Sequence, residues 1–170
     1  MQFAKDSFYA ALRERLAALN PARTVVLNGS ERPAIIVVEN ELPNATRWLP
    51  NTFYLEWGGI KIVQCKSGTP PITGLECVIT YATEGSIASG VDRGRGLGEL
   101  DAELLQMCQP CHTEKRDFRQ SPSADLGTGV FWSLPEFQKS TSAGELTSRT
   151  ARLERKAAVS VFFFPEETQL

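Results

Sequence analysis

The sequence predicts an α+β protein in which two helices pack against a mixed, mostly antiparallel sheet. Two stretches carry apolar residues at helical spacing, and the segments between and after them are rich in β-branched and aromatic residues. Most of these segments are joined by hairpin-like connections rather than by a repeated βαβ pattern. The expected order is α-β-β-β-α-β-β, ending in a long C-terminal strand or hairpin arm.

The composition is that of a globular protein, and we expect residues 1–170 to form a single domain. Of 170 residues, 42% are hydrophobic and 22% are charged. The formal net charge is -2 with no basic cluster, so we expect no nucleic-acid partner. The longest apolar run, Ala157–Phe164, is too short to cross a bilayer, and the N-terminus has no export pattern. We therefore expect a cytoplasmic protein with reduced cysteines and no membrane partner.

The first helix is expected over Asp6–Leu19. Asp6 or Ser7 can cap its first turn, and Asn20-Pro21 ends it, because the residue before a proline avoids the helical region. The apolar positions that recur at helical spacing are Phe8, Ala11, Leu12, Leu16 and Leu19.

A hairpin or a close relative of one is expected next. The runs Thr24–Leu27 and Ala34–Glu39 flank Asn28-Gly29, a dipeptide that adopts positive φ at low cost. The continuous apolar run Ile35–Val38 does not alternate, which predicts a strand covered on both faces. We expect this strand to lie near the centre of the sheet.

Two further strands follow a polar loop at Leu42–Asn51. Thr52–Lys66 predicts one long bent strand with a bulge at Gly58-Gly59, or two short strands. A loop rich in proline and glycine is expected at Lys66–Gly74. Apolar and polar residues then alternate over Leu75–Tyr81, which predicts a half-buried strand.

The second helix is expected over Leu97–Cys108. Its apolar stripe runs through Leu97, Leu100, Leu104, Cys108 and Cys111, which places both cysteines on the buried face of the helix or just past its end. The preceding stretch, Glu84–Gly98, predicts a flexible glycine loop. Three charged residues in that loop are candidate contacts with a partner: Asp92, Arg93 and Arg95.

The C-terminal part predicts a long connection over His112–Thr128, a short strand over Gly129–Leu134 and a polar stretch over Gln138–Ser148. The last strand, Arg149–Phe164, has one apolar face. Its first half is too polar for a core, so we expect it to project as an arm. Candidate interface residues on the opposite face of this strand are Arg152, Glu154 and Lys156.

The string Cys108-Gln109-Pro110-Cys111-His112 is the sharpest candidate site. It matches the pattern of covalent haem attachment, but that chemistry follows export, and no distal ligand is evident. A zinc site formed by Cys108, Cys111 and His112 would need Cys65 or Cys77 as a fourth ligand. A redox pair needs its first cysteine at a helix N-terminus, whereas this pair closes a helix. The favoured interpretation is two small apolar side chains that finish a buried stripe, with no cofactor, metal or catalytic residue.

The element order resembles that of the tail terminator proteins of long-tailed bacteriophages. The resemblance rests on a helix over Phe8–Leu19, a strand entered by Arg32–Val37 with two strands after it, a helix over Leu97–Cys108 and two closing strands. It implies a non-enzymatic subunit of a homo-oligomeric, typically hexameric ring in the virion. Such a ring caps the tail tube and joins it to the head-completion proteins. The alternatives are a small metal-binding or thiol-redox protein centred on Cys108, Cys111 and His112, and a cytoplasmic adaptor domain.

Overall fold

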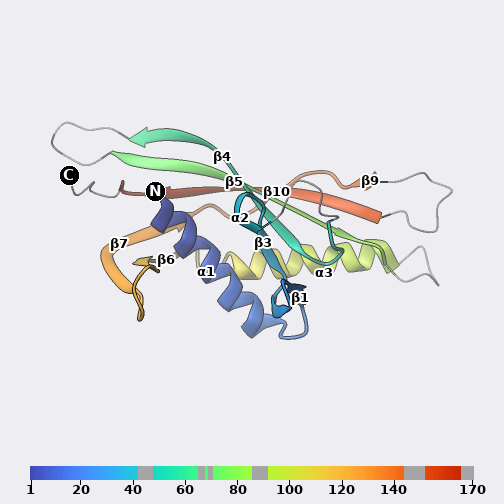
Figure 1. Ribbon diagram of the computed structural model, residues 1–170. Coiled ribbons are helices and arrows are strands. Elements are labelled where there is room, and N and C mark those ends of the chain that lie inside the picture. Colours follow the sequence, from blue (N-terminus) through green and yellow to red (C-terminus); the bar gives the residue numbers. More distant parts are fainter. Residues whose placement is uncertain (42–47, 65–67, 69–70, 86–91, 144–151, 166–170) are drawn as a thin grey trace.

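The computed structural model describes residues 1–41, 48–64, 68, 71–85, 92–143 and 152–165 (Figure 1). Helices and a mixed, mostly antiparallel sheet confirm the predicted α+β class. Among the described residues, no helix is long and apolar enough to cross a membrane. The elements are α1 (Gln2–Leu19), β1 (Thr24–Leu27), β2 (Ser30–Pro33), β3 (Ile35–Val37), α2 (Val38–Glu41), β4 (Phe53–Gln64), β5 (Ile72–Thr83), α3 (Asp92–Met107), β6 (His112–Asp117), β7 (Ala124–Trp132), β8 (Glu136–Phe137), β9 (Thr141–Ala143) and β10 (Arg152–Phe163).

The main sheet has the strand order β3-β4-β5-β10-β7-β6, with β8 and β9 also paired to β10. Among the described strands, only β3 and β4 pair in parallel. Strand β10 pairs with β5 from Leu153 to Phe163, and its other edge is taken in turn by β9, β8 and β7. The long C-terminal strand is therefore confirmed, but the expected projecting arm is wrong. The described first half of β10 is an internal strand, bonded on both sides.

The main core lies between one face of this sheet and the helices α1 and α3 (Figure 1). The apolar face of β10 points into it, as the alternation in its sequence predicted. A smaller cluster covers part of the opposite face, where the ring of Trp48 stacks on that of Tyr54 with centroids 4.3 Å apart. The buried residues of this second cluster are Val25, Ala34, Ile36 and Tyr54.

Helix α1 begins at Gln2, earlier than expected, and Met1 at its N-cap provides no side-chain hydrogen bond. Asp6 and Ser7 therefore lie within the helix, and the prediction that one of them caps it is wrong. The Ser7 hydroxyl donates to the carbonyl of Phe3 at 2.6 Å and accepts the amide N–H of Arg116 at 2.9 Å. Ser7 thus joins α1 to strand β6.

The hairpin forms at Asn28-Gly29, where both residues have positive φ, but β1 pairs with β2 rather than with residues 34–39. Ile35–Val37 is buried on both faces, as predicted. It forms the short parallel strand β3 at one end of the sheet order, so the expectation of a central strand is wrong. Because Val38 begins α2, β3 is too short to run along the whole of β4.

Strand β4 runs through Gly58-Gly59 with a register shift between Trp57 and Ile60, which confirms a single strand with a bulge. Strand β5 starts at Ile72, so the predicted loop over 66–74 is too long at its C-terminal end. The other parts of that loop that the structure describes are Gly68 and Pro71, and the expectations for residues 42–47 and 144–151 lie outside the described residues.

Helix α3 begins at Asp92, so Asp92, Arg93 and Arg95 lie on its first turns and not in a loop. A Cβ atom at Gly96 would lie 3.0 Å from the hydroxyl of Thr83. This close approach of α3 to β5 explains one of the glycines that made the segment look like a loop.

The expected connection over 112–128 is also wrong, because it contains β6 and part of β7, paired antiparallel. The buried positions of β6 are Lys115 and Asp117, both charged. With charged residues at the inward positions, β6 shows none of the apolar alternation that identifies a strand in a sequence. The sequence did not predict β8 and β9, because strands of two and three residues are too short to show an alternating pattern.

Candidate functional site

The cysteine motif lies at the end of α3 and the start of β6. Cys108 is fully buried, and the indole Nε1 of Trp132 donates to its carbonyl at 2.8 Å. Burial raises the pKa of the Cys108 thiol to about 12, and the neighbouring Cys111 adds to the shift. A thiol with this pKa stays protonated at neutral pH, which makes it a poor nucleophile.

Arg15 of α1 forms hydrogen bonds with backbone carbonyls of the same motif. Its guanidinium donates to the carbonyls of Met107, Pro110 and His112 at 2.9, 2.7 and 2.9 Å. It also lies over the Trp132 ring, 5.1 Å from the centroid. A cation at the C-terminal end of a helix satisfies carbonyls that have no partner within the helix. Cys108, Cys111 and His112 therefore lie in a helix-ending turn that Arg15 holds in place.

Of the two further cysteines considered for a zinc site, the structure describes Cys77. Cys77 is buried in β5, where desolvation raises the pKa of its thiol well above the ordinary value. Cys65 lies outside the described residues. Within the described part of the chain, no three His, Cys, Asp or Glu side chains are grouped so that they could hold a metal ion.

The six candidate interface residues fall into two groups at the same end of the sheet. Gly96 of α3 lies against Thr83 of β5, and Thr83 pairs with Leu153 of β10, so the start of α3 is near the start of β10. The groups are on opposite sides, however. The first, on α3 and the helix-covered side, is Asp92, Arg93 and Arg95; the second, on the other face of β10, is Arg152, Glu154 and Lys156.

Within the second group, Arg152 and Glu154 form an ion pair at 3.2 Å, and Lys156 is exposed. The structure therefore places the two groups on two separate charged surfaces. Whether either surface contacts a partner remains a prediction.

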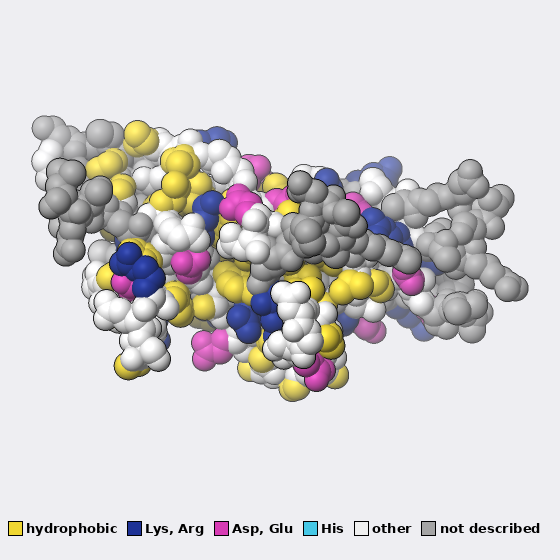
Figure 2. All heavy atoms as spheres, in the orientation of Figure 1, with side chains coloured by type: hydrophobic (Ala, Val, Ile, Leu, Met, Phe, Trp, Pro, Cys, Tyr) yellow, Lys and Arg dark blue, Asp and Glu magenta, His cyan; other side chains and the backbone are white. Residues whose placement is uncertain are grey.

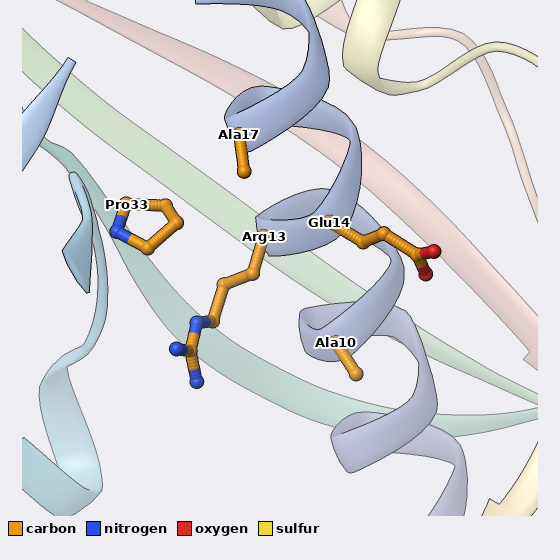
Figure 3. A pocket seen from close by; sticks show the side chains of 5 residues that line it. All are labelled: Ala10, Arg13, Glu14, Ala17 and Pro33. Carbon is orange, nitrogen blue, oxygen red and sulfur yellow. The ribbon is translucent and has the colours of Figure 1, made fainter. Parts of the chain in front are cut away.

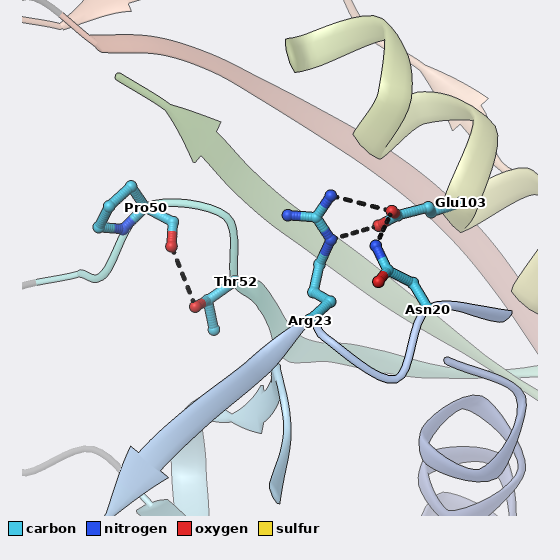
Figure 4. Close-up of polar contacts among 5 residues, drawn as sticks. All are labelled: Asn20, Arg23, Pro50, Thr52 and Glu103. Carbon is cyan, nitrogen blue, oxygen red and sulfur yellow. Dashed lines mark hydrogen bonds and ion pairs between the residues drawn. The ribbon is translucent and has the colours of Figure 1, made fainter. Parts of the chain in front are cut away.

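Helix α3 is fixed to its neighbours by two carboxylates. Asp101 accepts the hydroxyl proton of buried Tyr81 and pairs with Arg155 of β10 at 3.1 Å. Glu103 accepts from Asn20 at 2.7 Å and pairs with Arg23, as Figure 4 shows. In the same view, the Thr52 hydroxyl donates to the carbonyl of Pro50 at 3.3 Å, just before β4 begins. These carboxylates act as anchors between elements.

An open hollow of about 330 Å³ lies between α1 and the end of β2 (Figure 3). Its walls are apolar at Ala10, Ala17 and Pro33, and Arg13 and Glu14 border it. The Arg13 guanidinium stacks on the Tyr9 ring, 5.3 Å from the centroid. No histidine, cysteine or carboxylate pair is among the five residues that line this hollow, so it presents no nucleophile with a base.

One edge of β4 is free over much of its length, which the sequence did not predict. Strand β3 pairs with β4 only over Phe53–Leu55. From Glu56 to Gln64, the only described strand that pairs with β4 is β5. Ile60, Ile62 and Val63 are 55%, 69% and 55% exposed. Figure 2 shows apolar side chains gathered over the end of the sheet where β4 ends. The available signal was the run Ile60–Val63 directly after two glycines.

Comparisons with known proteins give little beyond this geometry. No protein-family model matches the sequence, and no curated protein matches it. A chain from the virion of a native gene transfer agent particle is 11% identical with a TM-score of 0.39, over 95% of this chain and 98% of that chain. A second solved protein is 14% identical with a TM-score of 0.40, over 97% of both chains. At these scores, neither similarity identifies the role of the chain.

Proposed function

We propose that this chain is a non-enzymatic structural subunit of a phage or prophage-derived tail, acting as a tail terminator. In this role it forms a closed, hexameric ring that caps the tail tube and binds the head-completion proteins. The supporting pattern is the order of elements, in which an N-terminal amphipathic helix, a group of strands, a second helix and closing strands follow one another. The ring and its partners come from the resemblance of this order to the tail terminator family.

The observation that carries an assembly role is the apolar end of the sheet. Three β-branched residues of β4 are more than half exposed there. Phe131 of β7 is 50% exposed and lies directly opposite Phe162 of β10. Large apolar side chains gathered at one end of a soluble protein mark a surface that another protein covers. A subunit that works by binding neighbours needs such a surface, whereas catalysis does not require it.

The two charged surfaces at the other end of the sheet supply a second set of contacts. In a ring, each subunit presents two different surfaces to its two neighbours, because the contact is head to tail. We assign Asp92, Arg93 and Arg95 to one of these surfaces, and Arg152, Glu154 and Lys156 to the other. The internal position of β10 means that its first half contributes side chains to this contact and not a free strand.

The test is the mass in solution by size-exclusion chromatography with light scattering, over a concentration series into the high micromolar range, followed by electron microscopy. We expect a closed oligomer, with six chains as the defined size, and a ring in projection. The charge reversal Arg95→Glu, on an exposed residue of α3, should weaken the ring, and Arg116→Glu on β6 serves as its control.

Addition of a tail-tube protein separates this proposal from an adaptor domain of the same architecture. A terminator should bind the end of an assembled tube and stop its growth. A chain that stays monomeric at every concentration, and that leaves tube growth unchanged, would overturn the proposal.

A further inference from the structure

The free edge of β4 is open backbone as well as apolar surface. One side of the strand pairs with β5 at Ile60–Ile62 and at Gln64, with register shifts before Ile60 and after Ile62. From Gly58 to Gln64, the other side has no strand partner among the described residues. Natural proteins shorten, cover or charge such edges, because unpaired backbone N–H and C=O groups attract another strand. Several consecutive backbone groups in a row are best satisfied by a second extended polypeptide.

The side chains along this edge define what such a strand must carry. Ile60 and Ile62 lie opposite Leu75 and Thr73 of β5, on the side of the sheet that faces the helices. Lys61 lies opposite Gly74, on the other side. An incoming strand therefore meets apolar, charged and apolar positions in turn. Opposite-charge and β-branched cross-strand pairs stabilise a sheet, and like charges destabilise it.

A second copy of the same edge meets a like charge in the antiparallel register that aligns all its isoleucines. Pairing Ile60 with Ile62 of the second copy places Lys61 directly against Lys61. Sliding the copies toward the bulge keeps Ile60 against Ile60 but places Ile62 against Gly58, which has no side chain to pack. Sliding them the other way pairs Ile62 with Ile62 and places Lys61 against Val63, so neither lysine gains an acidic partner. Sliding further toward the bulge brings Ile62 of one copy against Leu55 of the other, where β3 already occupies the edge.

We propose that Gly58–Gln64 of β4 is a docking edge for an extended segment of another protein, in which an acidic residue stands between two β-branched or aromatic residues. Lys61 selects that segment through its charge, and the same charge disfavours the self-pairing register that joins Ile60 to Ile62. This inference uses the same apolar end of the sheet that supports an assembly role, but it concerns the backbone edge of β4. It does not rest on the ring contacts that we assign to the charged surfaces at the other end of the sheet.

The test uses the full chain and two acetylated nine-residue peptides, which place Val-Glu-Val or Val-Lys-Val between flanking threonines. Affinities are measured by titration followed by NMR, and hydrogen exchange reports the protection of the β4 amides. We expect the Val-Glu-Val peptide to bind about fivefold to tenfold more tightly, since attraction is exchanged for repulsion at one cross-strand pair. The amides of Gly58–Gln64 should gain protection in the same titration.

The variant Lys61→Glu should invert this preference, and Arg116→Glu on β6 should leave it unchanged. Both residues are exposed, so circular dichroism should show that both variants keep the fold. If neither peptide protects β4, or if Lys61→Glu does not invert the preference, the proposal is wrong.

A second variant tests the guarding role of Lys61 without any peptide. Lys61→Val removes the like-charge pair from the register that joins Ile60 to Ile62, so the variant should reach a larger mass than the wild type in a concentration series. An unchanged mass at high micromolar concentration would overturn this part of the proposal. Peptide binding and the mass of Lys61→Val both report on β4. Either result can therefore be negative while the wild type forms a ring, and either can be positive while it does not.

Discussion

Strands β6 and β4 both border the main sheet, but their outer edges are treated in opposite ways. The outer side of β6 is closed by α1, since the Arg116 amide donates to Ser7 and the start of the strand is held by Arg15. Its side chains are almost all polar or charged, and Lys115 donates to the carbonyl of Phe164 at 2.8 Å. Beyond Leu55, β4 has three exposed β-branched side chains beside Lys61, and no described strand pairs with its outer side.

The difference shows that one protein can protect one edge and leave another available. Closing an edge requires hydrogen-bonding groups from outside the sheet, and α1 supplies them to β6 from Ser7 and Arg15. The edge of β4 has Lys61 and the register shifts before Ile60 and after Ile62, and charged side chains and bulges are both devices that limit unwanted pairing. The contrast predicts large effects of substitution along β6 and small effects along β4.

The largest effect is expected for Arg15→Ala. The substitution removes three charge-assisted hydrogen bonds to carbonyls and the stacking on Trp132, so we expect a loss of about 2–3 kcal/mol in the free energy of unfolding. Denaturant unfolding measures this loss. Arg15→Lys keeps the charge without the planar guanidinium, so its free energy of unfolding should lie between those of the wild type and Arg15→Ala. A loss below about 0.5 kcal/mol for Arg15→Ala would mean that α1 does not hold the start of β6.

A smaller effect is expected for Ser7→Ala, which leaves the Arg116 amide without its acceptor. We expect a loss of about 1 kcal/mol in the free energy of unfolding and faster hydrogen exchange at that amide. Ser30→Ala, at an exposed serine of β2, is the matched control and should change neither quantity. Unchanged exchange at Arg116 in the Ser7 variant would contradict the closure of this edge.

The pH dependence of stability should report the end of β6. Arg119 donates to the Asp117 carboxylate through its side chain and its backbone N–H, and these bonds lower the pKa of Asp117 from 3.8 to about 2. Because the folded pKa is lowered, the stabilisation is complete above about pH 4 and is lost as the pH falls toward 2.

Asp117→Asn should remove this part of the acid dependence, and Glu136→Gln on exposed β8 should keep it. Thermal melts between pH 2 and pH 5 compare the variants. Identical acid profiles for the wild type and Asp117→Asn would show that the carboxylate does not stabilise the turn after β6.

The same contrast explains how far the sequence predicted the fold. Strands β5 and β10 were recognised because their inward positions are apolar and alternate with polar ones. Strand β6 was missed because the sheet buries Lys115 and Asp117 at its inward positions. The acceptor of Lys115 is the carbonyl of Phe164, which is 49 positions away, whereas Arg119, the partner of Asp117, is two positions away. The burial of Lys115 therefore depends on a tertiary contact that a local pattern does not contain.

The candidate sites show the same limit. The sequence placed Cys108 correctly on a buried stripe, since that inference needed only helical spacing. The role of Arg15 at the motif was not predictable, because its acceptors are more than ninety positions away in the chain. The open edge of β4 was missed for a related reason. The sequence predicted the strand, but which of its edges stays unpaired depends on where β3 ends.

The smallest effect is expected for Ile62→Thr on β4. This side chain is 69% exposed, so we expect a change below about 0.5 kcal/mol in the free energy of unfolding. Ile79→Thr, the same change at a fully buried position of β5, should cost at least about 2 kcal/mol because it loses apolar contacts and buries a hydroxyl. Denaturant unfolding at low protein concentration compares the pair. A cost for Ile62→Thr near that of Ile79→Thr would mean that Ile62 is buried in solution, and the edge of β4 would then be as closed as that of β6.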